Sequence, residues 1–191
     1  MFNPSFREKA YLQQAEKQAI ARATLELIEE GDSLILDAGS TTHALARAMK
    51  KRFRHLHIIT NSVPIALELS ETSWELLLLG GSVRHHSQAL IGPATVRALE
   101  PYHVDKAIIS ATGASVTQGL TTPNDLEAQT KRAMIRAAAH VIAIVDSSKL
   151  GRVTLASFAA LGELSALVTD WNASPDILET LANLNVIVAR D

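Results

Sequence analysis

The sequence predicts an α/β fold in which a mostly parallel sheet lies between two layers of helices. Short β-type runs alternate with helical patterns along most of the chain. Most of these runs are continuously apolar, as expected of strands that are covered on both faces. Readable helix starts follow several of them. Alternating strand and helix units are typical of a doubly wound, three-layer architecture.

Length and composition fit one soluble globular domain. The chain has 191 residues, of which 47% are apolar and 20% are charged, so it can bury a substantial core. A net charge of −2 without a polybasic cluster argues against nucleic-acid binding by this chain alone. The absence of cysteine excludes disulfides and thiolate metal sites. We see no signal-peptide pattern and no apolar run of membrane length, and therefore expect a cytoplasmic location.

The first expected element is one long amphipathic helix over residues 6–30, which Gly31 ends. Its apolar positions recur at three- and four-residue spacing: Leu12, Ala15, Ala19, Ala23 and Leu27. We treat residues 1–30 as an N-terminal linker helix and residues 31–191 as one α/β domain. We expect the helix to pack on this domain or against a second subunit, which favours a homodimer or homotetramer.

Seven strands are expected beyond that helix, at 34–36, 56–60, 76–79, 107–110, 141–145, 166–169 and 186–189. Three of the helices between them have start signals. Ser62 can cap a helix with Pro64 in its first turn, and Ser174 precedes Pro175 in the same manner. The third signal is the run Thr122-Pro123-Asn124-Asp125, which offers a cap and a proline at the first helical position.

The loop after the first expected strand is the most informative stretch of the sequence. It reads Asp37-Ala38-Gly39-Ser40-Thr41-Thr42 and opens a helix. Backbone N–H groups at a helix start, at the positive end of the helix dipole, suit an anion such as phosphate. The Ser and Thr hydroxyls add donors, and Gly39 allows the backbone to approach a ligand closely. A helix cap without a ligand remains the alternative.

Other loops that follow strands carry similar small polar residues, and a parallel sheet brings them to one edge. They are 60–62, 80–84, 111–115, 118–122 and 146–149. Two cations, Arg84 and Lys149, and two carboxylates, Asp37 and Asp146, lie among them, which suits a phosphorylated sugar or polyol. Alternatives stay open here. Asp37 can bind a sugar hydroxyl or brace loop N–H groups, Asn61 can be a turn residue, and Lys149 can pair with Asp146.

Together these loops resemble the C-terminal sensor domain of DeoR-type sugar-operon repressors. The matching pieces include Asp-Ala-Gly-Ser-Thr-Thr (37–42), Thr-Asn-Ser (60–62), Gly-Gly-Ser-Val-Arg (80–84), Lys-Arg-Ala-Met-Ile (131–135) and Asp-Ser-Ser-Lys (146–149). In that family the domain binds a phosphorylated sugar effector, and an N-terminal winged helix-turn-helix binds DNA. The resemblance implies a sugar-phosphate-sensing domain of a bacterial transcriptional repressor. The chain begins in what looks like the connecting helix, so DNA would be bound only through a domain missing here.

The expected fold also resembles that of ribose-5-phosphate isomerase and of CoA-transferase-like proteins. A sugar-phosphate isomerase is therefore the alternative function. That isomerase needs an acidic loop where this chain has Ser110-Ala111-Thr112-Gly113-Ala114, and its catalytic glutamate falls at Lys131. A lysine there cannot act as the carboxylate base. We therefore predict a binding domain and not an enzyme. A scaffold module without a small ligand is the third alternative.

The predicted ligand-binding residues are Asp37, Gly39, Ser40, Thr41, Thr42, Asn61, Ser62, Gly81, Arg84, Gly113, Lys131, Asp146 and Lys149; the contact by Lys131 is implied by the family resemblance. No catalytic residue is predicted, because no Ser lies in a hydrolase motif. We expect no cofactor. We expect no metal, because the pairs His55/His57 and His85/His86 have no further ligand at suitable spacing. The expected partner is a phosphorylated sugar or polyol.

Overall fold

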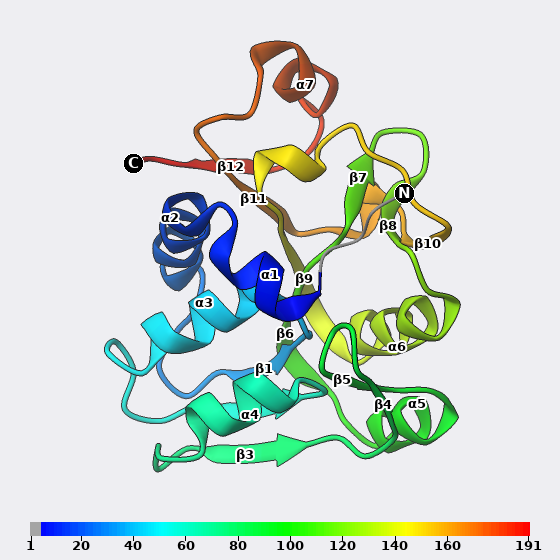
Figure 1. The fold of residues 1–191 in the computed structure, drawn as a ribbon. Helices are drawn as coiled ribbons and strands as arrows, with labels where there is room; N and C mark the ends of the chain where they lie inside the picture. The colour runs from blue at the N-terminus through cyan, green and yellow to red at the C-terminus, as the bar shows by residue number, and fades with distance from the viewer. Residues whose placement is uncertain (1–4) are drawn as a thin grey trace.

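The structure is a computed structural model that describes residues 5–191. Its centre is a seven-stranded sheet with the order β12-β11-β9-β6-β1-β2-β3, in which every neighbouring pair is parallel (Figure 1). The strands are β1 (Ser33–Leu36), β2 (His57–Thr60), β3 (Glu75–Leu78), β6 (Val104–Ile109), β9 (Ala138–Ile144), β11 (Ala166–Asp170) and β12 (Val186–Ala189). All seven strands expected from the sequence are therefore confirmed, with ends that differ by a few residues.

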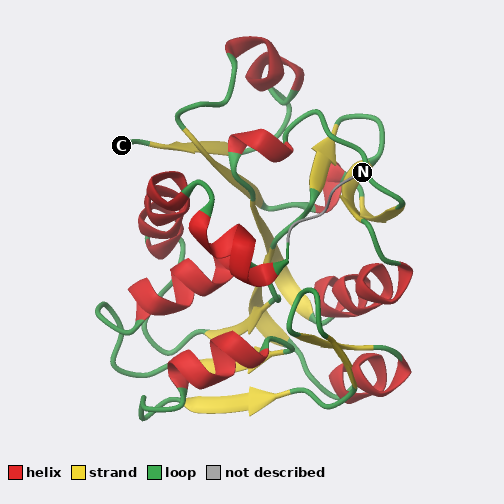
Figure 2. Ribbon diagram, viewed as in Figure 1, coloured by secondary structure: helices red, strands yellow, loops and turns green. Residues whose placement is uncertain are grey.

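Helices cover both faces of this sheet, which confirms the three-layer architecture (Figure 2). One face carries α2 (Gln14–Leu25), α3 (Ser40–Met49) and α4 (Val63–Leu69). The other carries α5 (Pro93–Leu99), α6 (Asp125–Arg136) and α7 (Pro175–Thr180). Ser62 and Ser174 accept hydrogen bonds from the first-turn N–H groups of α4 and α7, so these two predicted caps are confirmed. No helix in residues 5–191 is long and apolar enough to span a bilayer.

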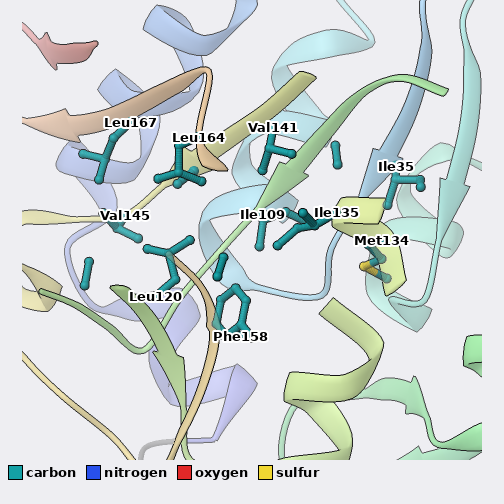
Figure 3. Packing of buried hydrophobic residues seen from close by; sticks show 14 of the residues in the cluster. Ile35, Ile109, Leu120, Met134, Ile135, Val141, Val145, Phe158, Leu164 and Leu167 are labelled. Carbon is teal, nitrogen blue, oxygen red and sulfur yellow. The ribbon is translucent and has the colours of Figure 1, made fainter. Parts of the chain in front are cut away.

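Two hydrophobic clusters hold the layers together, one on each face of the sheet. Figure 3 shows part of the larger cluster, where Phe158, Leu120 and Ile109 point toward one another between the sheet and the smaller elements that cover it. The second cluster packs Ile20 and Leu45, from α2 and α3, onto the opposite face. Strands buried on both faces explain why their sequences are continuously apolar.

Strand order reverses between β1 and β6. From β1 the chain proceeds to β2 and β3 on one side, whereas β6, β9, β11 and β12 lie on the other. The topological switch point therefore lies between β1 and β6, at the carboxyl edge of the sheet. Ligands of doubly wound sheets bind at such switch points.

Two small antiparallel sheets were missed by the sequence analysis. One has the order β10-β8-β7 and the other pairs β4 with β5. Their strands are β4 (Ser82–Arg84), β5 (Ala89–Ile91), β7 (Gly113–Ser115), β8 (Gly119–Thr122) and β10 (Ala156–Ala159). Because Thr122 ends β8, it does not cap α6. Asn124 does, with its side chain accepting from the N–H of Glu127, and the predicted position of Pro123 inside the helix is wrong.

The single N-terminal helix over 6–30 is also wrong. The chain forms α1 (Phe6–Tyr11) and α2, with a corner between them. Gln13 at the corner has φ +47°, in the left-handed region that non-glycine residues rarely adopt. α2 ends at Leu25, well before Gly31.

α2 packs on the domain itself, against α3, β11 and β12. The face that it buries differs from the predicted stripe. Ile20, Ala21 and Thr24 are buried together with Ala19, whereas Leu12 is exposed. The corner at Gln13 turns Leu12 away from the surface that α2 covers.

Candidate anion site at the carboxyl edge of the sheet

A cavity of about 990 Å³ lies at the carboxyl edge of the central strands. Its walls come from segments far apart in the sequence: the α1–α2 corner, the β1–α3 loop, the β4–β5 turn, the loop after β6, the start of α6, and residues 145–155. Figure 1 draws α1 in deep blue beside α3, across the front of this region. The cavity is therefore closed partly by an element that the sequence analysis treated as a linker.

The N-terminus of α3 opens into the cavity. Gly39 is its N-cap residue and provides no side-chain hydrogen bond, and the first intrahelical bond is donated by His43 to the Gly39 carbonyl. Within residues 5–191, no acceptor is recorded for the N–H groups of Gly39, Ser40 and Thr41 or for the two hydroxyls. Ser40 and Thr41 both line the cavity. Five donors at the positive end of a ten-residue helix thus face an open space, which suits an anion.

Gly39 is required by close packing against the protein itself. A Cβ atom at this position would lie 2.4 Å from Ser110 Oγ. The backbone of Gly39 is extended, so the constraint is steric. From the sequence, Gly39 was expected to allow the backbone to approach a ligand, whereas in the structure it allows close approach to the loop that follows β6.

Beneath the α3 N-terminus lies a buried network that we call the floor cluster, made of Asp37, Ser110 and Lys131. Asp37 Oδ2 accepts from the Ser110 N–H at 3.0 Å and from the Ser110 hydroxyl at 2.7 Å. Lys131 Nζ donates to the same carboxylate oxygen and, at 3.0 Å, to the Ser110 carbonyl. Its ammonium also lies 5.4 Å from the centre of the Phe158 ring. Asp37 and Lys131 are only 1% and 6% exposed, so each charge depends on the other.

A second charged cluster follows β9. Asp146 accepts at Oδ1 from the backbone N–H of Ser148 (3.2 Å), from the Ser148 hydroxyl and from Lys149 Nζ (3.3 Å). Lys149 also donates to Ser148 Oγ at 2.8 Å. The alternative of an Asp146–Lys149 salt bridge is confirmed. Both residues also line the cavity, so the pair is compatible with a further contact to a ligand.

The opposite wall, which we call the roof, is formed by the α1–α2 corner from Phe6 to Lys17. Lys17 Nζ donates to the carbonyls of Lys9 and Leu12 and so caps the C-terminus of α1. Lys9 also lines the cavity and has no hydrogen-bond or ion-pair partner for Nζ within the described chain. Burial lowers the pKa of Lys9 to about 8 and that of Lys17 to about 8, and positive neighbours that include Lys149 add to this effect.

Glu127, in the first turn of α6, joins this helix to the β4–β5 hairpin and to β8. Its carboxylate accepts from Arg84 Nε at 2.9 Å, from Ser87 Oγ at 2.6 Å and from Thr122 Oγ1 at 2.9 Å. Burial raises its pKa, but the Lys131 ammonium, these hydroxyls and Arg84 outweigh that effect and hold the pKa below its ordinary value. Glu127 is therefore a structural anion, and Arg84 is its partner.

The charge of the lining is unbalanced. Five cationic side chains line the cavity (Lys9, Lys17, Lys131, Lys149 and Arg152), against two carboxylates (Asp146 and Glu127). Together with the open N-terminus of α3, this excess favours an anionic occupant.

The predicted ligand-binding residues fall into three groups. Six of them line the cavity: Gly39, Ser40, Thr41, Lys131, Asp146 and Lys149. Two, Asp37 and Asn61, line a small adjoining recess. Five lie outside both linings: Thr42, Ser62, Gly81, Arg84 and Gly113.

Each residue of the last group has a role within the fold. Thr42 Oγ1 donates to the Gly39 carbonyl, and Ser62 caps α4. Gly81 has φ +145°, and a Cβ atom there would meet Thr95 Oγ1 at 2.1 Å. A Cβ atom on Gly113 would lie 2.5 Å from the Arg152 carbonyl. These residues hold together the elements around the cavity, and the structure offers no support for a ligand contact by them.

Asn61 is also a brace. Its Oδ1 accepts from the Ala38 N–H at 3.0 Å and its Nδ2 donates to the Leu90 carbonyl at 3.0 Å, so it ties the β1–α3 loop to β5. Of the two roles considered for Asp37, the structure shows bracing, because its carboxylate accepts from Ser110 of another loop.

Several lining residues were missed by the sequence analysis, namely Lys9, Lys17, His86, Ser110 and Glu127. Lys9 and Lys17 lay in a segment interpreted as a linker. No sequence signal indicated the corner that brings the two lysines to the cavity. In residues 5–191 no group of three or more His, Cys, Asp and Glu side chains could hold a metal ion.

Comparisons with known proteins identify the family of this chain. Residues 12–171 match the family described as the DeoR C terminal sensor domain. The chain is 37% identical over 172 residues to the HTH-type transcriptional regulator GlpR of Haloferax volcanii, covering 90% of this chain and 67% of that protein. It is 29% identical over 185 residues to the glycerol-3-phosphate regulon repressor of Escherichia coli K12, covering 96% and 73%. It thus spans about two thirds of the length of these relatives.

Solved structures show the same fold at low identity. Ribose 5-phosphate isomerase A from Methanocaldococcus jannaschii has a TM-score of 0.52 at 19% identity, over 72% of this chain and 54% of that one. eIF2B delta from Chaetomium thermophilum has a TM-score of 0.59 at 13% identity, over 82% and 56%. The chain therefore has the isomerase-like fold, and by its sequence it belongs to the family of DeoR C-terminal sensor domains.

Proposed function

We propose that this sensor domain binds a phosphorylated sugar or polyol and thereby regulates a transcriptional repressor of carbohydrate metabolism. The observation that carries the proposal is the uncapped N-terminus of α3, which opens into a cavity with an excess of cations. The relatives support the sugar class, since one of them is named as a glycerol-3-phosphate regulon repressor.

The phosphate sits on the N–H groups and hydroxyls of residues 39–41, with Lys149 and the roof lysines as counter-charges. Lys131 is held by Asp37 and adds long-range attraction. The sugar hydroxyls lie toward Asp146, Thr112 and Glu127, which also line the cavity. Hydrogen bonds to individual hydroxyls set the choice of sugar.

We further propose that the site does not catalyse isomerisation. Lys131 occupies the place of the isomerase base and is paired with Asp37. Glu127 already accepts three side-chain hydrogen bonds, so it is poorly placed to move a proton. Turnover of ribose 5-phosphate by the purified chain would contradict this part of the proposal.

Effector binding regulates by a population shift. The ligand favours one arrangement of the domain or of a homodimer or homotetramer, to the extent of its differential affinity. In a longer regulator, that arrangement changes DNA binding by a helix-turn-helix domain. Such a regulator works in the cytoplasm.

The test is a thermal-shift panel of sn-glycerol 3-phosphate, glucose 6-phosphate and fructose 1-phosphate, each beside its unphosphorylated counterpart. A ligand at 100 times its Kd stabilises the chain by about 2.7 kcal/mol, which raises Tm measurably. We expect at least one phosphorylated compound to shift Tm and its counterpart to leave it unchanged. Equal Tm shifts by a phosphorylated compound and its counterpart would show that the phosphate is not recognised. No shift with any phosphorylated sugar would contradict the proposal.

A further inference from the structure

The α1–α2 corner conflicts with its own sequence. Residues 10–18 read Ala-Tyr-Leu-Gln-Gln-Ala-Glu-Lys-Gln, without a glycine or proline. Most of these residues favour a helix, and nothing in the run ends one. The chain nevertheless turns at Gln13, in the left-handed region. Local preference therefore favours a straight α1–α2 helix, and the contacts of α1 with the cavity must impose the corner.

Those contacts hold α1 in place at a cost. Phe6 donates its N–H to the His86 carbonyl at 2.8 Å and packs edge-on against His43. Three features oppose the docked position. Gln13 is strained, Lys9 and Lys17 are partly desolvated cations, and His86 Nε2 is buried without a partner among the described residues.

An anion in the cavity would relieve one of these costs directly. It would supply counter-charge to the roof lysines, which face Lys131 and Lys149 across the cavity. A straight helix would carry α1 away from the cavity and forfeit that interaction. Occupancy of the site thus shifts the balance between two shapes of the same segment.

We propose that α1 is a latch with two positions, docked over the cavity or continuous with α2, and that an anion in the cavity shifts the population toward the docked position. The latch rests on the proposed function for the identity of its physiological anion, but any anion that occupies the cavity should operate it. It converts occupancy of the site into a change of helix direction at Gln13.

Amide hydrogen exchange of the full chain distinguishes the two positions. In the docked form Phe6 N–H is bonded to His86, whereas the N–H groups of Gln14, Ala15 and Glu16 precede the first bond of α2, donated by Lys17. In a straight helix the N–H groups of residues 14–16 gain carbonyl acceptors, and the N–H group of Phe6 loses the His86 carbonyl. The probe is saturating inorganic phosphate, with ionic strength matched by chloride.

We expect phosphate to slow exchange at Phe6 by about tenfold or more and to speed exchange at residues 14–16. Unchanged exchange at both places would overturn the latch.

A pair of variants tests the corner itself. Gln13→Gly and Gln13→Ala remove the same side chain, but glycine tolerates the left-handed corner and alanine favours the straight helix. Phosphate should bind the glycine variant about tenfold more tightly than the alanine variant. The matched pair Gln18→Gly and Gln18→Ala, at an exposed position inside α2, should agree within about twofold. Equal affinities for the two Gln13 variants would overturn the proposal.

The sugar-phosphate panel separates the two proposals. If phosphate moves α1 but no sugar phosphate binds, the latch stands and the proposed function fails. If a sugar phosphate binds without any change at Phe6 or residues 14–16, the proposed function stands and the latch fails.

Discussion

The floor cluster and the roof face each other across the same cavity but differ in how their charges are satisfied. In the floor cluster Lys131 is paired with Asp37, and both also make hydrogen bonds with Ser110. In the roof Lys9 has no partner for its ammonium in the described chain, and Gln13 is held in an unfavourable backbone conformation. The floor cluster thus pairs its charges within the protein, whereas under the proposed function a bound anion supplies the counter-charge that the roof lacks. A sensor needs both: a fixed surface to bind and a surface whose stability depends on binding.

The floor cluster gives the largest expected effect. Lys131→Met leaves the Asp37 carboxylate buried without its cation, and we expect the free energy of unfolding to fall by about 3–5 kcal/mol. Urea denaturation measures it. The exposed pair Arg52–Glu26 provides a control, since Arg52→Met should cost about 0–1 kcal/mol. Adding Asp37→Asn to Lys131→Met should recover part of the loss. Similar costs for the buried and the exposed pair would contradict the claim that the charges of Asp37 and Lys131 depend on each other.

The open N-terminus of α3 gives the next effect, on binding. Ser40→Asp places a carboxylate in the first turn, where the helix dipole stabilises it, but it also repels an anionic ligand. We expect unchanged or slightly higher stability without ligand and at least about tenfold weaker binding of a sugar phosphate, about 1.4 kcal/mol. Calorimetric titration measures the affinity, and the neutral variant Ser40→Asn is the control. Weakening of the same size in both variants would remove charge as the cause.

Binding should also depend on pH through the roof. Burial lowers the pKa of Lys9 and of Lys17 to about 8, from an ordinary 10.5. A bound phosphate raises both values, so the complex holds more protons than the free chain above pH 8. We expect affinity to fall by roughly tenfold between pH 7.5 and pH 9.5, with proton uptake on binding near pH 8.5. Other charged groups that face this cavity include Glu127, Lys131, Lys149 and Asp146. Phosphate itself stays dianionic in this pH range.

The unbound chain should show the opposite trend. Between pH 8 and 10.5 an unfolded lysine keeps its proton while a docked one has lost it, so stability should rise with pH in that window. Titrations in buffers of different ionisation enthalpy, together with denaturation at each pH, measure both quantities. Affinity that is flat from pH 7.5 to 9.5 would exclude the roof lysines as counter-charges.

The smallest effect is expected for Lys9→Met in the absence of ligand. Because this ammonium is desolvated and unpaired, its removal should leave the free energy of unfolding within about 1 kcal/mol of the wild type, on the stabilised side. The same denaturation experiment as for Lys131→Met makes the two lysines directly comparable. A loss as large as that of Lys131→Met would mean that roof and floor are equivalent.

Sequence patterns were enough to predict the elements that form because their side chains are buried. The seven central strands are apolar because both faces are covered, and that requirement is visible in the sequence. The loop from Asp37 to Thr42 was also readable, because a helix start after a buried strand has a chemistry of its own. The sequence did not show which residues far apart in the chain form pairs. Glu127 meets Arg84, and Lys131 meets Asp37, across 43 and 94 residues of chain.

The corner at Gln13 could not have been predicted for a different reason. Its local sequence favours a helix. The hydrogen bond from Phe6 to the distant His86 and the hydrogen bond from Lys17 to α1 oppose a straight helix. Tertiary contacts overrode propensity there, and the proposed latch rests on the same conflict. Lys9 and Lys17 were not predicted as site residues because this corner was not predicted.

The most direct test of the central claim is a calorimetric titration of the wild-type chain with a phosphorylated sugar and its unphosphorylated counterpart at pH 7.5. The structure predicts saturable binding of the phosphorylated compound and affinity at least about tenfold lower for the counterpart, because the α3 N-terminus and the roof lysines have no anion to meet. Equal affinity for the two compounds, or no heat from any phosphorylated sugar of the panel, would contradict it.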